Sequence, residues 1–359
     1  MIFISAQPHD LQFIWQLDVQ IHNLKRLGYT EDYHILMYKP PYHKDWNKEL
    51  DDLEDKWKDS PNIKFFRYSD DEGFFNLANE IMYVSLIRPW MLMKHFELYE
   101  NLENEYIFYW DSDVLLTKKV PMSFHFGMNK MALVSYTGHR EGKNYLDYDY
   151  LYSKIFQAIP EKLEQLRQID PIAKFAECAG ITKEIILKNN RGVGGAQYVL
   201  KGINYRFWED VIETCVRLKP FMSRLNQEFF PGSTPQEREN NGWQSWCADM
   251  WAVLWNLWKR DVRTDSWNKM DFAWSTDPIE KIDEVFIYHD AGALSKRMEL
   301  NGKKVTMFAK GEFKKKSPLT DIKYLQHVDE RYCSSFYAKE LILLHESNLR
   351  TTQANTSVL

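Results

Sequence analysis

Apolar residues in the first third of the chain form short continuous runs separated by longer amphipathic stretches. The runs at 1–5, 33–38, 63–68 and 106–110 are continuous rather than alternating, as in strands buried on both faces. Between the first two runs, Ile14, Leu17 and Ile21 recur at helical spacing. Strands that alternate with helices predict an α/β fold with a mostly parallel sheet covered by helices.

The rest of the chain continues this pattern with more helix. Strands are expected at 131–136 and within 284–295, and residues 192–202 form a glycine-punctuated strand or loop. Helices are expected at 207–218 and 243–260, with a loop at 229–242 between them. We therefore predict one large domain over residues 1–349 with a helical insertion at about 147–188. A disordered tail is expected at 350–359.

Composition narrows the class of protein. The 44% share of hydrophobic residues is enough for a large core, and 13 Trp, 20 Tyr and 21 Phe suit either that core or the binding of sugars and flat rings. A net charge of −5 disfavours a broad nucleic-acid or anionic-membrane surface. The three lysines at 314–316 are interpreted as a solvated loop. Widely spaced cysteines, no signal peptide and no long apolar window indicate a cytoplasmic protein without a membrane span, in the host cytoplasm if the chain is viral.

Two acids, Asp111 and Asp113, directly follow the apolar run at 106–110. Burying two carboxylates without partners would cost several kcal/mol each, so something must compensate them. In open α/β sheets ligands bind beyond the carboxyl ends of the strands, and residues i and i+2 of an extended chain point to the same side. Such a pair suits Mg²⁺ or Mn²⁺, although helix capping or a salt bridge would also explain it. A second pair, Asp147 and Asp149, is interpreted as part of a solvated loop.

These acids resemble the D-x-D motif at the end of the fourth strand in glycosyltransferases of the GT-A type, a Rossmann-like fold. In that family the acids hold Mn²⁺ or Mg²⁺ against the diphosphate of a nucleotide-sugar donor. The segment YHDAG at 288–292 is similar to the H-x-x-G element of many such enzymes. The resemblance implies that His289 is a third metal ligand, that Gly292 lets the backbone approach the pyrophosphate and that Lys310 contacts the same phosphates.

A closer resemblance is to the hydroxyproline O-arabinosyltransferase and peptidyl-serine galactosyltransferase group and its virus-encoded relatives. Six short segments come in that group's order over about residues 1–294, among them RPWMLMKHF, FYWDSDVLL, GGAQYVLKG and WCADMWAVLW. The chain departs from the group in having Asp249 where glutamate is common, and in the helical insertion. The GT-A resemblance also places the nucleobase and ribose of the donor at Ser5, Ala6 and Gln7, after the first strand.

An acid also lies within the very apolar helix at 243–260. Asp249 belongs to a narrow polar stripe on this helix, so it is either paired or functional. In glycosyl transfer it could be the general base for the acceptor, hold donor hydroxyls or stabilise positive charge at the anomeric carbon. A buried salt bridge is the structural alternative. Arg88 could pair with Asp249 or bind the donor.

Four more residues are candidates for donor binding. Gly194 and Gly195 would allow close backbone approach, and Gln197 beside them could bind a hydroxyl group; a plain turn explains the glycines equally well. Ser112, between the two acids, completes the predicted donor site.

The sequence thus predicts a metal-dependent hexosyl- or pentosyltransferase that moves a sugar from a UDP-sugar to a hydroxyl acceptor. The acceptor is left open between a peptide, a glycan and a hydroxymethylpyrimidine in DNA. Two alternatives remain. An aspartate-dependent phosphohydrolase would use Asp111 as its nucleophile. A non-catalytic glycan-binding protein would keep the fold without turnover.

Overall fold

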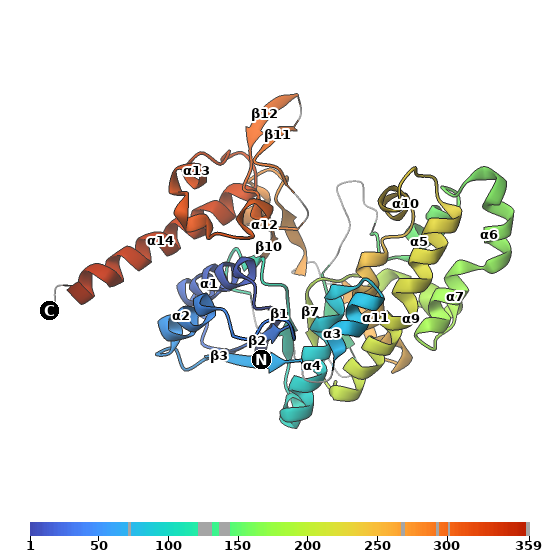
Figure 1. The fold of residues 1–359 in the computed structure, drawn as a ribbon, viewed down its shortest axis with the longest axis horizontal. Helices are drawn as coiled ribbons and strands as arrows, with labels where there is room; N and C mark the ends of the chain where they lie inside the picture. Colours follow the sequence, from blue (N-terminus) through green and yellow to red (C-terminus); the bar gives the residue numbers. More distant parts are fainter. Residues whose placement is uncertain are drawn as a thin grey trace.

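The computed structural model describes residues 1–70, 73–120, 131–135, 144–266, 270–291, 294–300 and 302–356. A seven-stranded sheet lies at its centre, in the order β3-β2-β1-β4-β7-β6-β8 (Figure 1). The strands are β1 (Ile2–Pro8), β2 (Asp32–Lys39), β3 (Ile63–Ser69), β4 (Ile107–Tyr109), β6 (Met131–Val134), β7 (Tyr198–Leu200) and β8 (Arg263–Ser266). The four apolar runs of the first third are therefore the strands β1 to β4, as predicted.

Most neighbours in this sheet are parallel. Strand β1 pairs in parallel with β2 and β4, and β6 with β8, whereas β7 runs antiparallel to both β4 and β6. Side chains alternate between two cores, because Ile4 packs with one hydrophobic cluster and Phe3, next to it, with the other. Both faces are thus buried, which explains the continuous apolar runs. The predicted mixed, mostly parallel sheet flanked by helices is confirmed.

Helices cover both faces of the sheet. On one face lie α3 (Phe74–Glu80), α4 (Ile87–Leu98), α9 (Tyr205–Phe229) and α11 (Ala248–Lys259). Helices α1 (Leu11–Arg26) and α2 (Lys48–Trp57) cover the other. A further group at the C-terminal end consists of α12 (Lys281–Glu284), α13 (Ile322–Gln326) and α14 (Ser334–Thr356). In the described part of the chain, none of the helices has the length and apolar content needed to cross a membrane.

A second, smaller sheet positions part of the site. It has the order β5-β10-β9, with β5 (Val114–Leu116), β9 (Phe272–Trp274) and β10 (Ile287–His289). The expected strand within 284–295 is therefore β10, which belongs to this sheet and not to the large one. A hairpin of β11 (Arg297–Leu300) and β12 (Lys303–Thr306) follows.

The segment at 147–188 is helical, with α5 (Tyr148–Ile155), α6 (Leu163–Ile169), α7 (Pro171–Cys178) and α8 (Lys183–Lys188). These helices lie beside α9, away from α1 and α2 (Figure 1). Asp147 and Asp149 are not in a loop as expected, because Asp147 is the N-cap of α5 and Asp149 lies in its first turn.

Two other segments contain more helix than expected. The predicted loop at 229–242 includes the end of α9 and the short helix α10 (Pro235–Asn241). Thr234 and Glu237 form a capping box that satisfies the first backbone N–H groups of α10. At the C-terminal end, α14 continues to Thr356, past residue 350 where the tail was expected, and it projects from the rest of the chain (Figure 1).

Candidate functional site

The two acids lie in the turn that carries the chain from the large sheet into the small one. Strand β4 ends at Tyr109, and the Val114 N–H donates to the Asp111 carbonyl oxygen at 3.3 Å as β5 begins. Strand β10 pairs antiparallel with β5, so that His289 lies opposite Val114. This register brings His289, which is far away in the sequence, beside the acids.

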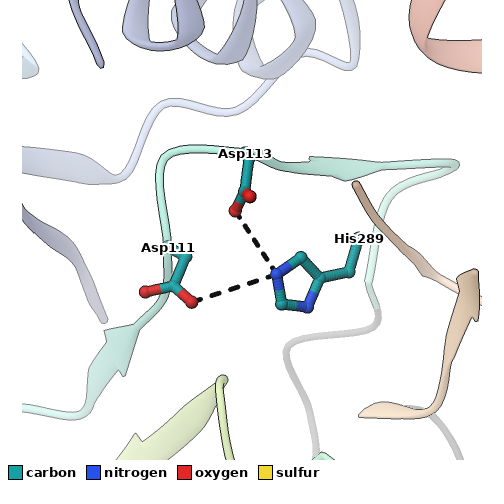
Figure 2. Close-up of side chains that lie close together, drawn as sticks. All are labelled: Asp111, Asp113 and His289. Atoms are coloured by element: carbon teal, nitrogen blue, oxygen red, sulfur yellow. Dashed lines mark ion pairs between the residues drawn. The ribbon is translucent and has the colours of Figure 1, made fainter. Parts of the chain in front are cut away.

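Asp111, Asp113 and His289 converge on a common point (Figure 2). His289 Nε2 lies 3.3 Å from Asp113 Oδ1 and 3.9 Å from Asp111 Oδ2. One ligand atom from each residue lies within 4.8 Å of the others. Asp113 Oδ1 is buried and accepts no hydrogen bond from the described residues. Two carboxylate oxygens and one imidazole nitrogen form a donor set that fits Mn²⁺ or Mg²⁺.

Two basic side chains lie against these acids. Lys310 forms an ion pair with Asp113 Oδ2 and also donates to the Asp290 carbonyl oxygen. Arg88 Nη1 lies 2.5 Å from Asp111 Oδ1. The negative charge of the two aspartates is therefore partly balanced by Arg88 and Lys310.

The pKa values of the two acids are shifted in opposite directions from the ordinary value of an aspartate. Burial raises the pKa of Asp111 above its usual range, and Arg88 offsets this only in part. Burial acts on the pKa of Asp113 in the same sense, but its interactions with Lys310 and His289 outweigh it and hold that pKa well below the usual range. Burial would lower the pKa of Lys310, yet Asp113 and Asp290 keep it above normal. Of these two acids, Asp113 is therefore the one whose ionised form the fold stabilises more.

Arg88 also connects the acids to the apolar helix α11. Its Nη2 lies 2.5 Å from Asp249 Oδ2, and the Tyr83 hydroxyl donates to Asp249 Oδ1 at 2.5 Å. The Asp249 backbone N–H in turn donates to the Tyr83 oxygen at 2.9 Å. The alternative of a buried salt bridge is thus present, and Arg88 forms it on one side while it holds Asp111 on the other.

Gln197 contacts His289 and not the space where a donor would bind. It is fully buried, and its side-chain amide lies 3.2 Å from His289 Nδ1. The amide oxygen Oε1 has no hydrogen-bond partner among the described residues. Amide nitrogen and oxygen exchange places on a half-turn, so the alternative orientation lets Oε1 accept from Nδ1–H. That arrangement would leave the Nε2 lone pair of His289 free to face the acids.

A cleft of about 610 Å³ opens over these groups. Its lining includes nine of the residues that the sequence predicts for the site, namely Ala6, Gln7, Arg88, Asp111, Ser112, Asp113, Asp249, His289 and Lys310. Ser112 is held by a hydrogen bond from its hydroxyl to Gln16 Oε1 at 2.7 Å. Gly292 lies outside the described residues.

Besides Gln197, three predicted donor-binding residues are not among the described residues that line the cleft. The Ser5 hydroxyl is buried 2.7 Å from the Tyr33 hydroxyl. A side chain at Gly194 would come within 2.1 Å of the Ser135 carbonyl oxygen, and one at Gly195 within 2.9 Å of Leu146. Close packing within the protein is therefore sufficient to explain both glycines.

Several residues of the cleft lining or buried behind it were not identified from the sequence. Tyr83 comes from the turn before α4, and its partners lie more than a hundred residues away. Tyr145, Gln244 and Trp246 form another part of the lining. Trp246 belongs to an aromatic-rich run whose other tryptophans are core residues, so only its exposure distinguishes it.

No family model and no curated protein matches this chain. Among solved structures, it is similar to the galactosyltransferase LgtC in complex with donor and acceptor sugar analogs, with 12% identity, a TM-score of 0.39 and coverage of 81% of this chain and 87% of that one. It is also similar to an active-site mutant of LgtC, with 12% identity, a TM-score of 0.40 and coverage of 82% and 88%.

Proposed function

We propose that this protein is a metal-dependent glycosyltransferase of the GT-A type that moves a sugar from a UDP-sugar to a hydroxyl acceptor. The convergence of Asp111, Asp113 and His289 carries the proposal. Three metal-ligating groups from two separate segments meet at the carboxyl end of a central strand, in the lining of a cleft large enough for a nucleotide sugar. This is the arrangement needed to hold a cation against a diphosphate.

Asp111, Asp113 and His289 would hold Mn²⁺ or Mg²⁺. When bound, the cation supplies positive charge that stabilises the departing diphosphate. Lys310 supports this role, because it is a half-buried ammonium group beside Asp113 and lines the same cleft. An ammonium group there can bind a phosphate oxygen once a cation takes over the charge of Asp113.

Asp249 would act on the sugar. Both of its carboxylate oxygens already accept hydrogen bonds, from Tyr83 and Arg88. Taking up the proton of an acceptor would neutralise the charge that pairs with Arg88, which favours stabilisation of positive charge at the anomeric carbon over the role of general base. Arg88 would keep Asp249 and Asp111 at a fixed separation, and its buried Nε, which has no partner among the described residues, is available to the donor.

Gln197 would orient His289. An imidazole that ligates a metal through Nε2 must carry its proton on Nδ1, and a hydrogen-bond acceptor at Nδ1 selects this tautomer. The Gln197 amide, 3.2 Å from Nδ1, can supply that acceptor. This replaces the role in binding donor hydroxyls that the sequence suggested for Gln197.

The nucleotide would bind at the carboxyl end of β1, which continues to Pro8 and therefore includes Ala6 and Gln7 rather than ending before them as the sequence suggested. Ala6 and Gln7 line the cleft there, and the amide oxygen of Gln7 is buried without a hydrogen-bond partner among the described residues. Such an oxygen can accept a hydrogen bond from a nucleobase N–H group. The proposal also includes membership of the hydroxyproline O-arabinosyltransferase group with its virus-encoded relatives, which is supported only by the six short sequence segments. A cytoplasmic location is likewise proposed from the sequence alone.

The direct test is the release of UDP from a panel of UDP-sugars, with Mn²⁺ and with a chelator. We expect release from at least one UDP-sugar with Mn²⁺ and none with the chelator. If calorimetry detects no binding of any UDP-sugar in the presence of Mn²⁺, the proposal is wrong. Release of phosphate from aryl phosphates, abolished by Asp111→Asn, would favour the phosphohydrolase instead.

A further inference from the structure

One wall of the cleft carries an aromatic surface that the proposed donor chemistry does not use. Trp246 is 59% exposed, whereas the other described tryptophans are buried or half-buried. It lines the cleft together with Tyr145, and the two rings lie 6.3 Å apart at 39° to each other. An exposed indole that lies in the lining of a cleft, next to a second aromatic ring, offers a ligand an apolar surface to cover.

The aromatic wall is attached to the reacting end of the cleft. The Tyr83 hydroxyl lies 3.1 Å from the Trp246 carbonyl oxygen and 2.5 Å from Asp249 Oδ1. A single buried oxygen thus fixes Trp246 relative to Asp249, and Arg88 connects Asp249 to Asp111. A molecule lying on Trp246 is therefore held at a defined position relative to the metal-ligating groups.

Arg88 and Lys310 belong to the proposed donor site, so the aromatic wall favours a neutral occupant. The basic side chains among the described residues of its lining are Arg88 and Lys310, and both are paired with aspartates. A nucleic acid needs unpaired cations for its phosphates. The three lysines at 314–316 are exposed but do not belong to this lining.

The lining of the cleft also contains uncharged polar side chains. Gln244 and Ser85 both line the cleft, and each can donate and accept hydrogen bonds. A pyranose ring matches this combination, because its C–H face packs on an aromatic ring while its hydroxyl groups bond to amides and hydroxyls. A peptide would gain more from a free strand edge, which these residues do not offer.

We propose that the acceptor is itself a sugar, a neutral pyranoside that lies on Trp246 and Tyr145 with one hydroxyl group directed toward Asp249. The inference rests on the proposed transferase function. In the transfer, the acceptor oxygen bonds to the anomeric carbon of the donor, and the bond from that carbon to the diphosphate breaks. UDP leaves with the electron pair, and the hydroxyl proton passes to a carboxylate or phosphate oxygen and then to water.

The experiment measures UDP release with Mn²⁺ and the best UDP-sugar, with and without added acceptor. The acceptor probes are the methyl α- and β-glycosides of glucose and galactose, lactose, a hydroxyproline- and serine-containing peptide, and an oligonucleotide with 5-hydroxymethylcytosine. We expect a pyranoside to stimulate release above the slow hydrolysis by water. Trp246→Ala should reduce this stimulation at least about tenfold, equivalent to about 1.4 kcal/mol, whereas Trp246→Phe keeps most of it.

Two controls separate this inference from the proposed function. Phe156→Ala, which removes another exposed aromatic residue outside the cleft lining, should leave both donor hydrolysis and stimulation intact. Binding of UDP with Mn²⁺ is measured in Trp246→Ala to show that any loss of stimulation does not come from a misfolded donor site. Stimulation that survives in Trp246→Ala, stimulation by the peptide or oligonucleotide alone, or no stimulation by any pyranoside would each overturn the inference. Loss of donor binding in the wild type would instead overturn the transferase proposal.

Discussion

The chain contains two Asp-x-Asp pairs with the same spacing and different surroundings. Asp111 and Asp113 follow the buried strand β4 and meet His289, Arg88 and Lys310. Asp147, by contrast, accepts a hydrogen bond from the Tyr150 backbone N–H at 2.7 Å and caps α5. Asp149 is exposed in the first turn of that helix, where a negative charge suits the helix dipole.

The comparison shows that the role of an Asp-x-Asp pair depends on the secondary structure in which it lies. At the end of a parallel strand, two carboxylates face a region where other strands also deliver polar groups, so a third ligand can reach them. At the start of a helix, the backbone N–H groups already satisfy one acid and solvent the other. The same Asp-x-Asp motif therefore predicts a cation site at the end of a parallel strand and a helix N-cap at the start of a helix.

The largest expected effect is on UDP release, which should depend on the first Asp-x-Asp pair and not on the second. Asp113→Asn and His289→Ala should each reduce Mn²⁺-dependent UDP release by on the order of 10²–10³-fold, because each removes a ligand of the group that stabilises the leaving diphosphate. Asp149→Asn is the matched control and should leave release unchanged. If all three variants lose activity alike, the first pair has no special role.

The next effect concerns the charge balance around the first pair. Arg88→Met leaves Asp111 and Asp249 without their shared partner, and we expect a loss of about 3 kcal/mol in the free energy of unfolding, measured with urea. Arg217→Met removes an exposed pair with Glu213 on α9 and should cost under about 0.5 kcal/mol. Equal losses in the two variants would show that the Arg88 bridge contributes little.

A smaller effect tests the orientation of the third ligand. Gln197→Leu removes the acceptor for His289 Nδ1 but keeps a side chain of similar size, and it should weaken Mn²⁺ binding about 10–100-fold by calorimetry. Gln197→Glu retains an acceptor and should restore part of that affinity. Unchanged affinity in Gln197→Leu would mean that the amide merely packs against the ring.

The smallest effect belongs to the second pair. Asp147→Ala removes the cap of α5 and should lower the free energy of unfolding by about 1 kcal/mol, with Mn²⁺ binding unaffected. Asp147→Asn retains an acceptor for the Tyr150 N–H and should recover most of the loss. A change in Mn²⁺ affinity in either variant would contradict the assignment of this pair to helix capping.

Much of the fold could be predicted because strands that are buried on both faces of a parallel sheet appear in the sequence as continuous apolar runs. The small sheet could not, since β5, β9 and β10 are three residues each and their pairing depends on distant segments. Helix α10 was missed because its residues are polar throughout, although the Thr234 and Glu237 capping box was a visible signal.

The residues of the candidate site also differ in whether they could be identified from the sequence. Asp111 and Asp113 could be identified from their position after a strand, whereas His289 and Lys310 came from the resemblance to GT-A enzymes. The roles of Gln197, Tyr83 and Trp246 depend on which side chains meet across the chain or stay exposed, and no local pattern carries that information. Gly194 and Gly195 show the converse, because internal packing and ligand binding both use glycine where a backbone approaches closely.

The most direct test of the account is to locate Mn²⁺ by anomalous X-ray diffraction in crystals soaked with MnCl₂ and UDP. We predict one strong anomalous peak in contact with Asp111, Asp113 and His289, with the UDP phosphates on its open side. A peak at Asp147 and Asp149 instead, or UDP bound with no manganese near His289, would contradict the proposed mechanism.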